Sequence, residues 1–169
     1  MDILSGFHPK VVHFPIAFFL VYILLELIGA IFKKDFFQKT AHLFLFLGVL
    51  GAVAAVLTGN LAENTANIFF GAGTVQRKAI GLHEDFATIT LWYFSALLVL
   101  RTIFTLRKKF SGKIKLIIVL LALIGGLLVY QTGELGGNLV YKYGIGTKLI
   151  KKDSTNNSER IPRWGDKTK

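Results

Sequence analysis

The sequence predicts an all-α fold, an integral membrane four-helix bundle with short loops and a polar C-terminal tail. Of its 169 residues, 53% are hydrophobic and only 18% are charged, a balance typical of membrane proteins. Four apolar runs are each long enough to supply the roughly 20 residues that a helix needs to cross the bilayer core. Short basic segments separate the runs, so the lipid bilayer is the expected surrounding.

The apolar runs define the expected elements in chain order. The spans cover about residues 9–32, 37–61, 82–106 and 114–133, within one domain over residues 1–148. No basic stretch precedes the first run, which is also too long for a cleavable signal peptide, so the first helix is expected to remain. Residues 149–169 are polar and poor in aliphatic side chains, as a mobile tail would be.

Charge gives the expected orientation. The loops after the first and third spans, with their flanks, hold nine Lys/Arg, whereas the opposite side holds three before the tail adds eight. Short loops weigh more than tails in the positive-inside rule, so both termini are expected outside the cytoplasm. The net charge of +10 therefore indicates basic loops at headgroups, and no nucleic acid partner is expected, because no nucleic-acid-binding motif occurs.

Three of the four histidines lie where spans begin on the outer side. His8 and His13 open the first span and His83 opens the third, so all three share one leaflet. Imidazoles on facing helices are suitable axial ligands of haem iron. His8 and His13 are five residues apart, about 140° around a helix, so both cannot face one iron. We expect His13 and His83 to ligate the iron, and His8 to bond backbone or a propionate.

A haem b site needs an apolar slot and polar partners for its propionates. Aromatic and aliphatic side chains near the histidines are expected to line the slot: Phe14, Ile16, Phe86 and Trp92. Polar residues of the same face are expected to complete cofactor binding: Lys10, Arg77, Lys78 and Gln131.

The chain has no cysteine, which excludes thiolate metal sites and iron–sulfur clusters ligated by this chain. No nucleophilic constellation occurs, so the chain is not expected to be an enzyme alone.

Other interpretations of the outer histidines stay open. A zinc or copper site would take three or four ligands, with Glu84 or Asp85 added, and a proton relay would use the same imidazoles without metal. Either would make the protein a metal or proton transporter. A structural or assembly subunit without cofactor would use the polar outer residues to contact neighbouring proteins.

Two further features concern the inside of the bundle. Pro15 removes a backbone donor and frees the carbonyl of Val11, so the first helix should bend or loosen near His13. Glu26, His42 and Arg101 lie in the inner half at similar depth. Ionisable groups in a membrane interior are costly and pair with one another, so these three are expected to form a mutually satisfying cluster or, as the alternative, a second functional site.

Four segments carry a family resemblance. They are "HPKVVHFPIAFFLVYILLE" at 8–26, "LTGN" at 57–60, "LHEDFA" at 82–87 and "GGNLVYKYGIGT" at 136–147. Together they resemble the bacterial and archaeal membrane protein family called domain of unknown function 2231. The resemblance implies a four-helix protein of a prokaryotic inner membrane. Haem b binding is a hypothesis for such proteins, and it is carried only onto His8, His13 and His83.

The segment at 136–147 is expected to lie at the outer end of the bundle. Two glycines are expected to end the fourth helix, after which "NLVYKYG" should fold over the outer mouth as a lid, or else form an unstructured strap.

The function expected is that of a haem-b-binding electron-transfer subunit of a larger membrane redox complex. It would exchange electrons with quinol or an extracytoplasmic cytochrome.

Overall fold

The computed structural model describes residues 7–32, 34–69, 74–107 and 112–145. Five helices account for nearly all of them: α1 (His8–Val11), α2 (His13–Phe32), α3 (Asp35–Phe69), α4 (Val75–Leu106) and α5 (Gly112–Tyr141). These ranges contain no strand, so the all-α prediction is confirmed. The expected polar tail, 149–169, lies outside the described residues.

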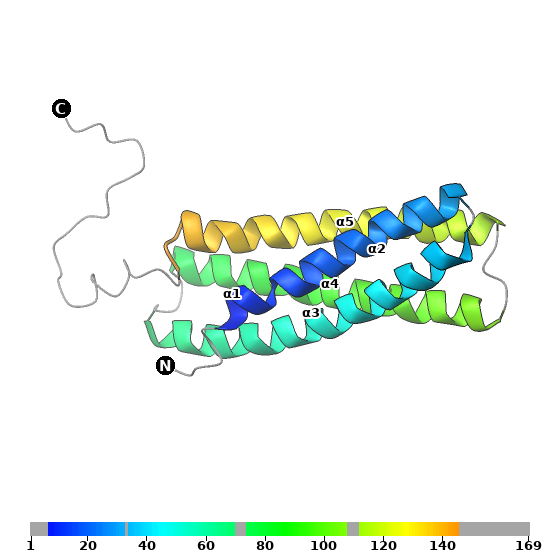
Figure 1. Cartoon of the computed structure of the whole chain (residues 1–169). Helices are drawn as coiled ribbons and strands as arrows, with labels where there is room; N and C mark the ends of the chain where they lie inside the picture. Colours follow the sequence, from blue (N-terminus) through cyan, green and yellow to red (C-terminus); the bar gives the residue numbers. More distant parts are fainter. Residues whose placement is uncertain (1–6, 33, 70–73, 108–111, 146–169) are drawn as a thin grey trace, which may run out of the picture.

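The long helices form an up-and-down bundle whose members run side by side along one axis (Figure 1). α2 packs against α3 and α5, and α4 packs against the same two helices. α2 and α4 are therefore diagonal partners. We call the end with His8 and His83 the histidine end; α1 lies there, with the end of α3, the start of α4 and the end of α5. The end near Arg101 is the arginine end.

The bundle has the dimensions and surface of a membrane protein. Four helical stretches are long and apolar enough to cross a bilayer: His8–Phe32, Asp35–Glu63, Val75–Leu106 and Gly112–Tyr141. Large apolar side chains face outward on every long helix, and Ile31, Trp92 and Leu127 are 71%, 70% and 69% exposed. A surface of this kind is suited to lipid rather than to water.

A break near the start of the first span separates α1 from α2. Pro15 has no backbone N–H, so the carbonyl of Val11 lacks its helical donor. The chain forms a turn at Val12, and the next bond, from Ile16 N to Val12 O, is long at 3.4 Å. The expected loosening near His13 is confirmed. α1 is thus a separate helical turn that packs against both α2 and α3.

The helices at the histidine end extend beyond the apolar runs. α3 continues to Phe69 and α4 begins at Val75, where the sequence suggested a loop from about 62 to 81. Thr74 caps α4 by accepting a hydrogen bond from the backbone N–H of Arg77 at 3.3 Å. The side chain of Arg77 also pairs with Glu63 of α3. The two helices therefore extend beyond the expected spans, because a helix supported by caps and ion pairs continues after its apolar run ends.

The end of α5 also differs from expectation. The helix runs through Gly136 and Gly137 to Tyr141, so these glycines do not end it. Gly144 ends it instead, with φ +67°, while Ile145 N donates to Leu139 O at 2.8 Å. The backbone N–H of Gly144 donates to Val140 O at 3.0 Å, which is the bond of an αL cap. The expected lid was wrong over residues 136–145, which form helix and cap; residues 146–147 lie outside the described residues.

Three side-chain pairs lie along the diagonal between the first and third spans. Glu26 and Arg101 form a buried ion pair and are 75 residues apart. The same offset relates Phe19 to Phe94, whose rings stack in mid-bundle with centroids 3.7 Å apart and planes within 10°. It also relates His8 to His83, which interact electrostatically. Equivalent positions of two helical hairpins, α1–α3 and α4–α5, therefore meet along one axis.

Glycines on the return helix of each hairpin make room for the central rings. A Cβ on Gly48 of α3 would lie 2.5 Å from Phe19, and one on Gly125 of α5 would lie 2.6 Å from Phe94. Both distances are shorter than any side chain tolerates. The two hairpins thus pack as structural repeats around a pseudo-two-fold axis along the bundle.

Candidate ligand site at the histidine end

His8 is held by a threonine of the neighbouring α3. Its Nδ1 lies 3.1 Å from Thr58 Oγ1, and the ring also interacts with the carbonyl of Ala55. The hydroxyl of Thr58 donates its own proton to the carbonyls of Ala54 and Ala55 at 2.9 and 3.0 Å. Thr58 must therefore accept from His8, which places the imidazole proton on Nδ1 and a lone pair on Nε2.

His83 is held in the same way by α5. Its Nδ1 lies 3.2 Å from the backbone carbonyl of Thr132, which is only an acceptor, so Nδ1 again carries the proton. The hydroxyl of Thr132 lies 2.9 Å from that of Thr90 and 3.3 Å from Phe86 O, which ties α5 to α4 beside the ring. The bond from Nδ1 leaves a lone pair on Nε2 of His83 as well.

The two rings lie at the same end of the bundle and have matching surroundings. His8 and His83 interact electrostatically, and each ring packs on a glycine of the return helix. A Cβ on Gly59 would lie 3.1 Å from His8 Cε1, and one on Gly136 would lie 3.0 Å from His83 Cε1. Fixing Nδ1 by an outer hydrogen bond so that Nε2 is presented is how proteins prepare histidine to bind a metal.

Sequence reasoning missed the signal that identifies this pair. The chain repeats the pattern Thr-Gly-x-Leu at 58–61 and at 132–135, and each copy follows one of the two histidines by 50 or 49 residues. Each repeated threonine supplies the partner of its histidine. Recognising the repeat would have selected His8 and His83 as equivalent residues.

The expected pairing of His13 with His83 is not found. The side chain of His13 is exposed on the bundle surface, as is that of Phe14. His8 faces the interior instead, because the break at Val12 lets α1 pack separately against α3. Of the residues expected to line a slot, Trp92 is exposed too, whereas Ile16 and Phe86 are half-buried.

The polar residues expected around a cofactor are dispersed. Lys10 is exposed near His8, with its Nζ 5.2 Å from the centre of the Phe7 ring. Arg77 is engaged with Glu63, and Lys78 is exposed. Gln131 is half-buried on α5. Of these, Lys10 is the basic side chain nearest in sequence to either histidine.

The number of protein ligands is small. Within the described residues, no group of three or more His, Cys, Asp or Glu side chains is placed to hold a metal ion. Glu84, considered as an additional ligand, lies beside Glu63 and Arg77. Two shallow grooves open near this end, of about 490 Å³ between α2 and α5 and about 360 Å³ between α4 and α5, and neither is lined by His8 or His83.

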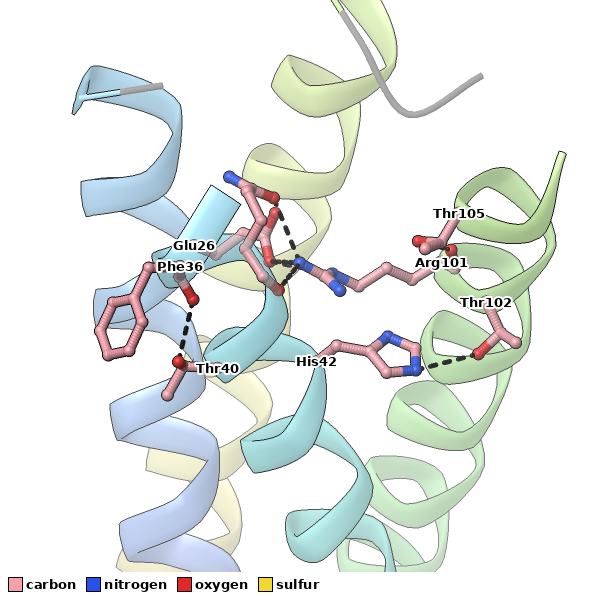
Figure 2. Close-up of polar contacts among 8 residues, drawn as sticks. Glu26, Phe36, Thr40, His42, Arg101, Thr102 and Thr105 are labelled. Carbon is pink, nitrogen blue, oxygen red and sulfur yellow. Dashed lines mark hydrogen bonds and ion pairs between the residues drawn. The ribbon is translucent and has the colours of Figure 1, made fainter. Parts of the chain in front are cut away.

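The arginine end contains the second polar cluster (Figure 2). Arg101 reaches from α4 towards α2, where its Nε donates to Glu26 Oε2 at 3.0 Å and its Nη2 forms an ion pair with the same oxygen at 2.9 Å. Nη2 also donates to the backbone and side-chain oxygens of Gln38 on α3, at 2.9 and 3.2 Å. The expected pairing of Glu26 with Arg101 is confirmed. His42 instead points to Thr102, 3.5 Å away, and the role of Gln38 was missed.

Comparison with known proteins adds the family. A family model described as "Predicted membrane protein (DUF2231)" matches residues 5–149. No curated protein and no solved structure matches the chain. The match covers both hairpins and both clusters, including His8, His83, Glu26 and Arg101. The chain therefore belongs to the DUF2231 family of predicted membrane proteins.

Proposed function

We propose that this protein is a membrane electron carrier that binds haem b between His8 and His83. The observation that carries the proposal is the matched pair of imidazoles on diagonal elements, each with its proton fixed on Nδ1 and a lone pair on Nε2. Each Nε2 lone pair is a donor that iron can accept. Bis-histidine ligation of haem iron is the membrane-protein chemistry that needs two such donors.

The ligand count favours haem over a bare metal ion. Zinc takes three or four protein ligands in a tetrahedral site, and the described residues offer two. A porphyrin supplies the four equatorial nitrogens itself, so two axial imidazoles complete the iron. Bound haem would supply reversible one-electron chemistry. In this chain His8 and His83 would hold the iron, Thr58 and Thr132 orient the two rings, and Lys10 would be available to a propionate.

Room for a porphyrin has to come from α1. Neither groove at the histidine end is lined by the two rings, and both rings pack closely on glycine. α1 is four residues long and separated from α2 by the break at Val12, so it can shift without unwinding α2. We propose that haem binding moves α1, while His83 stays fixed on the long helix α4.

The proposed setting follows from loop charge. The positive-inside rule places the histidine end on the extracytoplasmic side of a prokaryotic inner membrane, with both termini outside. Electrons would then be exchanged with quinol or an extracytoplasmic cytochrome, within a larger redox complex. Transfer across the whole membrane by this chain alone is not proposed, because the arginine end has only one histidine, His42.

A reduced-minus-oxidised spectrum of the purified full chain, produced with ample haem, tests the proposal. We expect a Soret band and a b-type α band. His8→Ala and His83→Ala should lose the bands, whereas His13→Ala and His42→Ala should keep them. Absence of haem from the wild type, with no bound metal by elemental analysis, would favour the structural role. Equal loss in all four variants would contradict the assigned ligands.

A further inference from the structure

The arginine end contains four buried polar atoms that lack hydrogen-bond partners within the described residues. They are Tyr22 OH, Glu26 Oε1, Gln38 Nε2 and His42 Nδ1. The side chains of Tyr22 and Glu26 are 0% exposed and Gln38 is 8% exposed. Buried polar groups are almost always satisfied, so four orphaned atoms in one region indicate a bound species.

Three of the four atoms, Tyr22 OH, Glu26 Oε1 and His42 Nδ1, belong to side chains around one guanidinium, whereas the Nε2 of Gln38 packs on Gly29 of α2. Arg101 bonds directly to Glu26 and Gln38, and it interacts electrostatically with Tyr22 and His42. Tyr22 and Glu26 are one turn apart on α2, and Gln38 and His42 are one turn apart on α3. The orphaned atoms therefore belong to two neighbouring helices that both bond to Arg101.

The hydrogen-bonding roles of the four atoms identify the species. Tyr22 OH and Gln38 Nε2 are donors. Glu26, paired with Arg101, is ionised and its Oε1 is an acceptor. The hydroxyl of Thr102 donates to Leu98 O at 2.7 Å, so it accepts from His42 Nε2–H, which makes His42 Nδ1 an acceptor too.

We propose that this cluster is a binding site for water. One donor, Tyr22 OH, and two acceptors, Glu26 Oε1 and His42 Nδ1, suit a molecule that both accepts and donates, and a buried water typically makes about three such bonds. A metal cation would face the guanidinium of Arg101 and the hydroxyl donor, and an anion would face the carboxylate of Glu26. The site does not depend on haem binding at the other end.

Bound water would give the cluster a chemical property that the direct contacts lack. It joins Tyr22 on α2 to His42 on α3, so a hydrogen-bonded path leads from the centre of the bundle to the half-buried ring of His42. Carboxylates and imidazoles connected in this way are the parts of intramembrane proton-exchange sites. The stacked Phe19 and Phe94 separate this hydrated layer from the histidine end.

Radiolytic hydroxyl-radical labelling of the full chain in detergent, read by mass spectrometry, tests the site. Radicals form from water that is already bound, so buried residues beside it are modified. We expect Tyr22 to be labelled several times faster than Phe19 and Phe94, which are as deeply buried but lie in the dry layer. Labelling of Tyr22 as slow as that of the two phenylalanines would overturn the proposal.

A substitution gives a second, independent readout. Tyr22→Phe removes the hydroxyl and keeps the ring. If water bonds the hydroxyl, the melting temperature should fall by about 2–4 °C, as for the loss of one hydrogen bond. Tyr93→Phe is the matched control, because its hydroxyl donates directly to Leu121 O at 2.7 Å and its loss must also lower the melting temperature. A rise for Tyr22→Phe, as expected for removal of an unbonded buried hydroxyl, would overturn the proposal.

Discussion

Two threonines fix the two histidines through different atoms. Thr58 uses its hydroxyl, whereas Thr132 uses its backbone carbonyl. A side-chain acceptor can be removed by substitution, and a backbone acceptor cannot. The two positions therefore form a natural pair of variant and control for the role of the Nδ1 hydrogen bond.

Thr58→Val should weaken haem binding by about 10–100-fold, the usual effect of losing the partner that orients a ligating histidine. Thr132→Val keeps the carbonyl and should leave the orientation of His83 intact, so its affinity should change much less. Haem titration of the apoprotein, followed by absorbance, measures both. Equal weakening in the two variants would mean that the hydroxyls act through helix packing rather than through the rings.

The sequence predicts at which end of the bundle the histidine site lies, but not which of the histidines face the interior there. It places His8, His13 and His83 at one end, and helical periodicity shows that His8 and His13 diverge. Periodicity gives the angle between two side chains but not which of them faces inward. That depends on how α1 packs after the break caused by Pro15, which is a tertiary effect.

Among the helices, α5 contacts the ring of His83 through only one of two adjacent glycines. Gly136 lies under the ring of His83, whereas a Cβ on the adjacent Gly137 would have no atom within 4 Å. The two residues have the same helical environment and differ only in what they face.

Gly136→Ala should therefore displace His83, reducing haem loading and lowering the melting temperature. Gly137→Ala should leave both unchanged or raise the melting temperature slightly, since alanine favours helix by up to about 1 kcal/mol over glycine. The haem-to-protein ratio and thermal unfolding of the two variants provide the comparison. Haem loss in Gly137→Ala alone would show that the ring of His83 lies elsewhere.

Apolar runs predict the existence and order of these elements but not their ends at the histidine side. An apolar composition identifies the part of a helix that lies in lipid. α3 and α4 extend beyond that part through polar residues. The Glu63–Arg77 pair and the Thr74 cap involve contacts that no single apolar run reveals. The end of α5 was misplaced because Gly136 and Gly137 were interpreted as a stop, whereas Gly144 carries the positive φ.

For the whole molecule, the central relation is that positions 75 residues apart meet on the axis. One such pair, Glu26 with Arg101, carries opposite charges and is fully buried. Its pairing was predictable from depth and sign alone. The repeat that relates the hairpins was not recognised, because its signature is only the short Thr-Gly-x-Leu pattern and the spacing of the histidines.

Breaking the axial ion pair should affect the entire bundle. Glu26→Leu or Arg101→Leu alone leaves a buried charge unpaired and should cost about 3–5 kcal/mol of unfolding free energy. The double substitution removes both charges and should cost less than either single change. Denaturant unfolding of the four proteins gives the coupling. Additive losses would mean that Glu26 and Arg101 act independently.

The most direct test of the account is the distance between His8 and His83. The chain has no cysteine, so His8→Cys with His83→Cys introduces the two thiols alone. A short bifunctional thiol reagent should link positions 8 and 83 in the folded protein, as read by mass spectrometry after proteolysis. The pair His13→Cys with His83→Cys should take up reagent at each position without linkage. Efficient linkage of 13 to 83, with none between 8 and 83, would contradict the site.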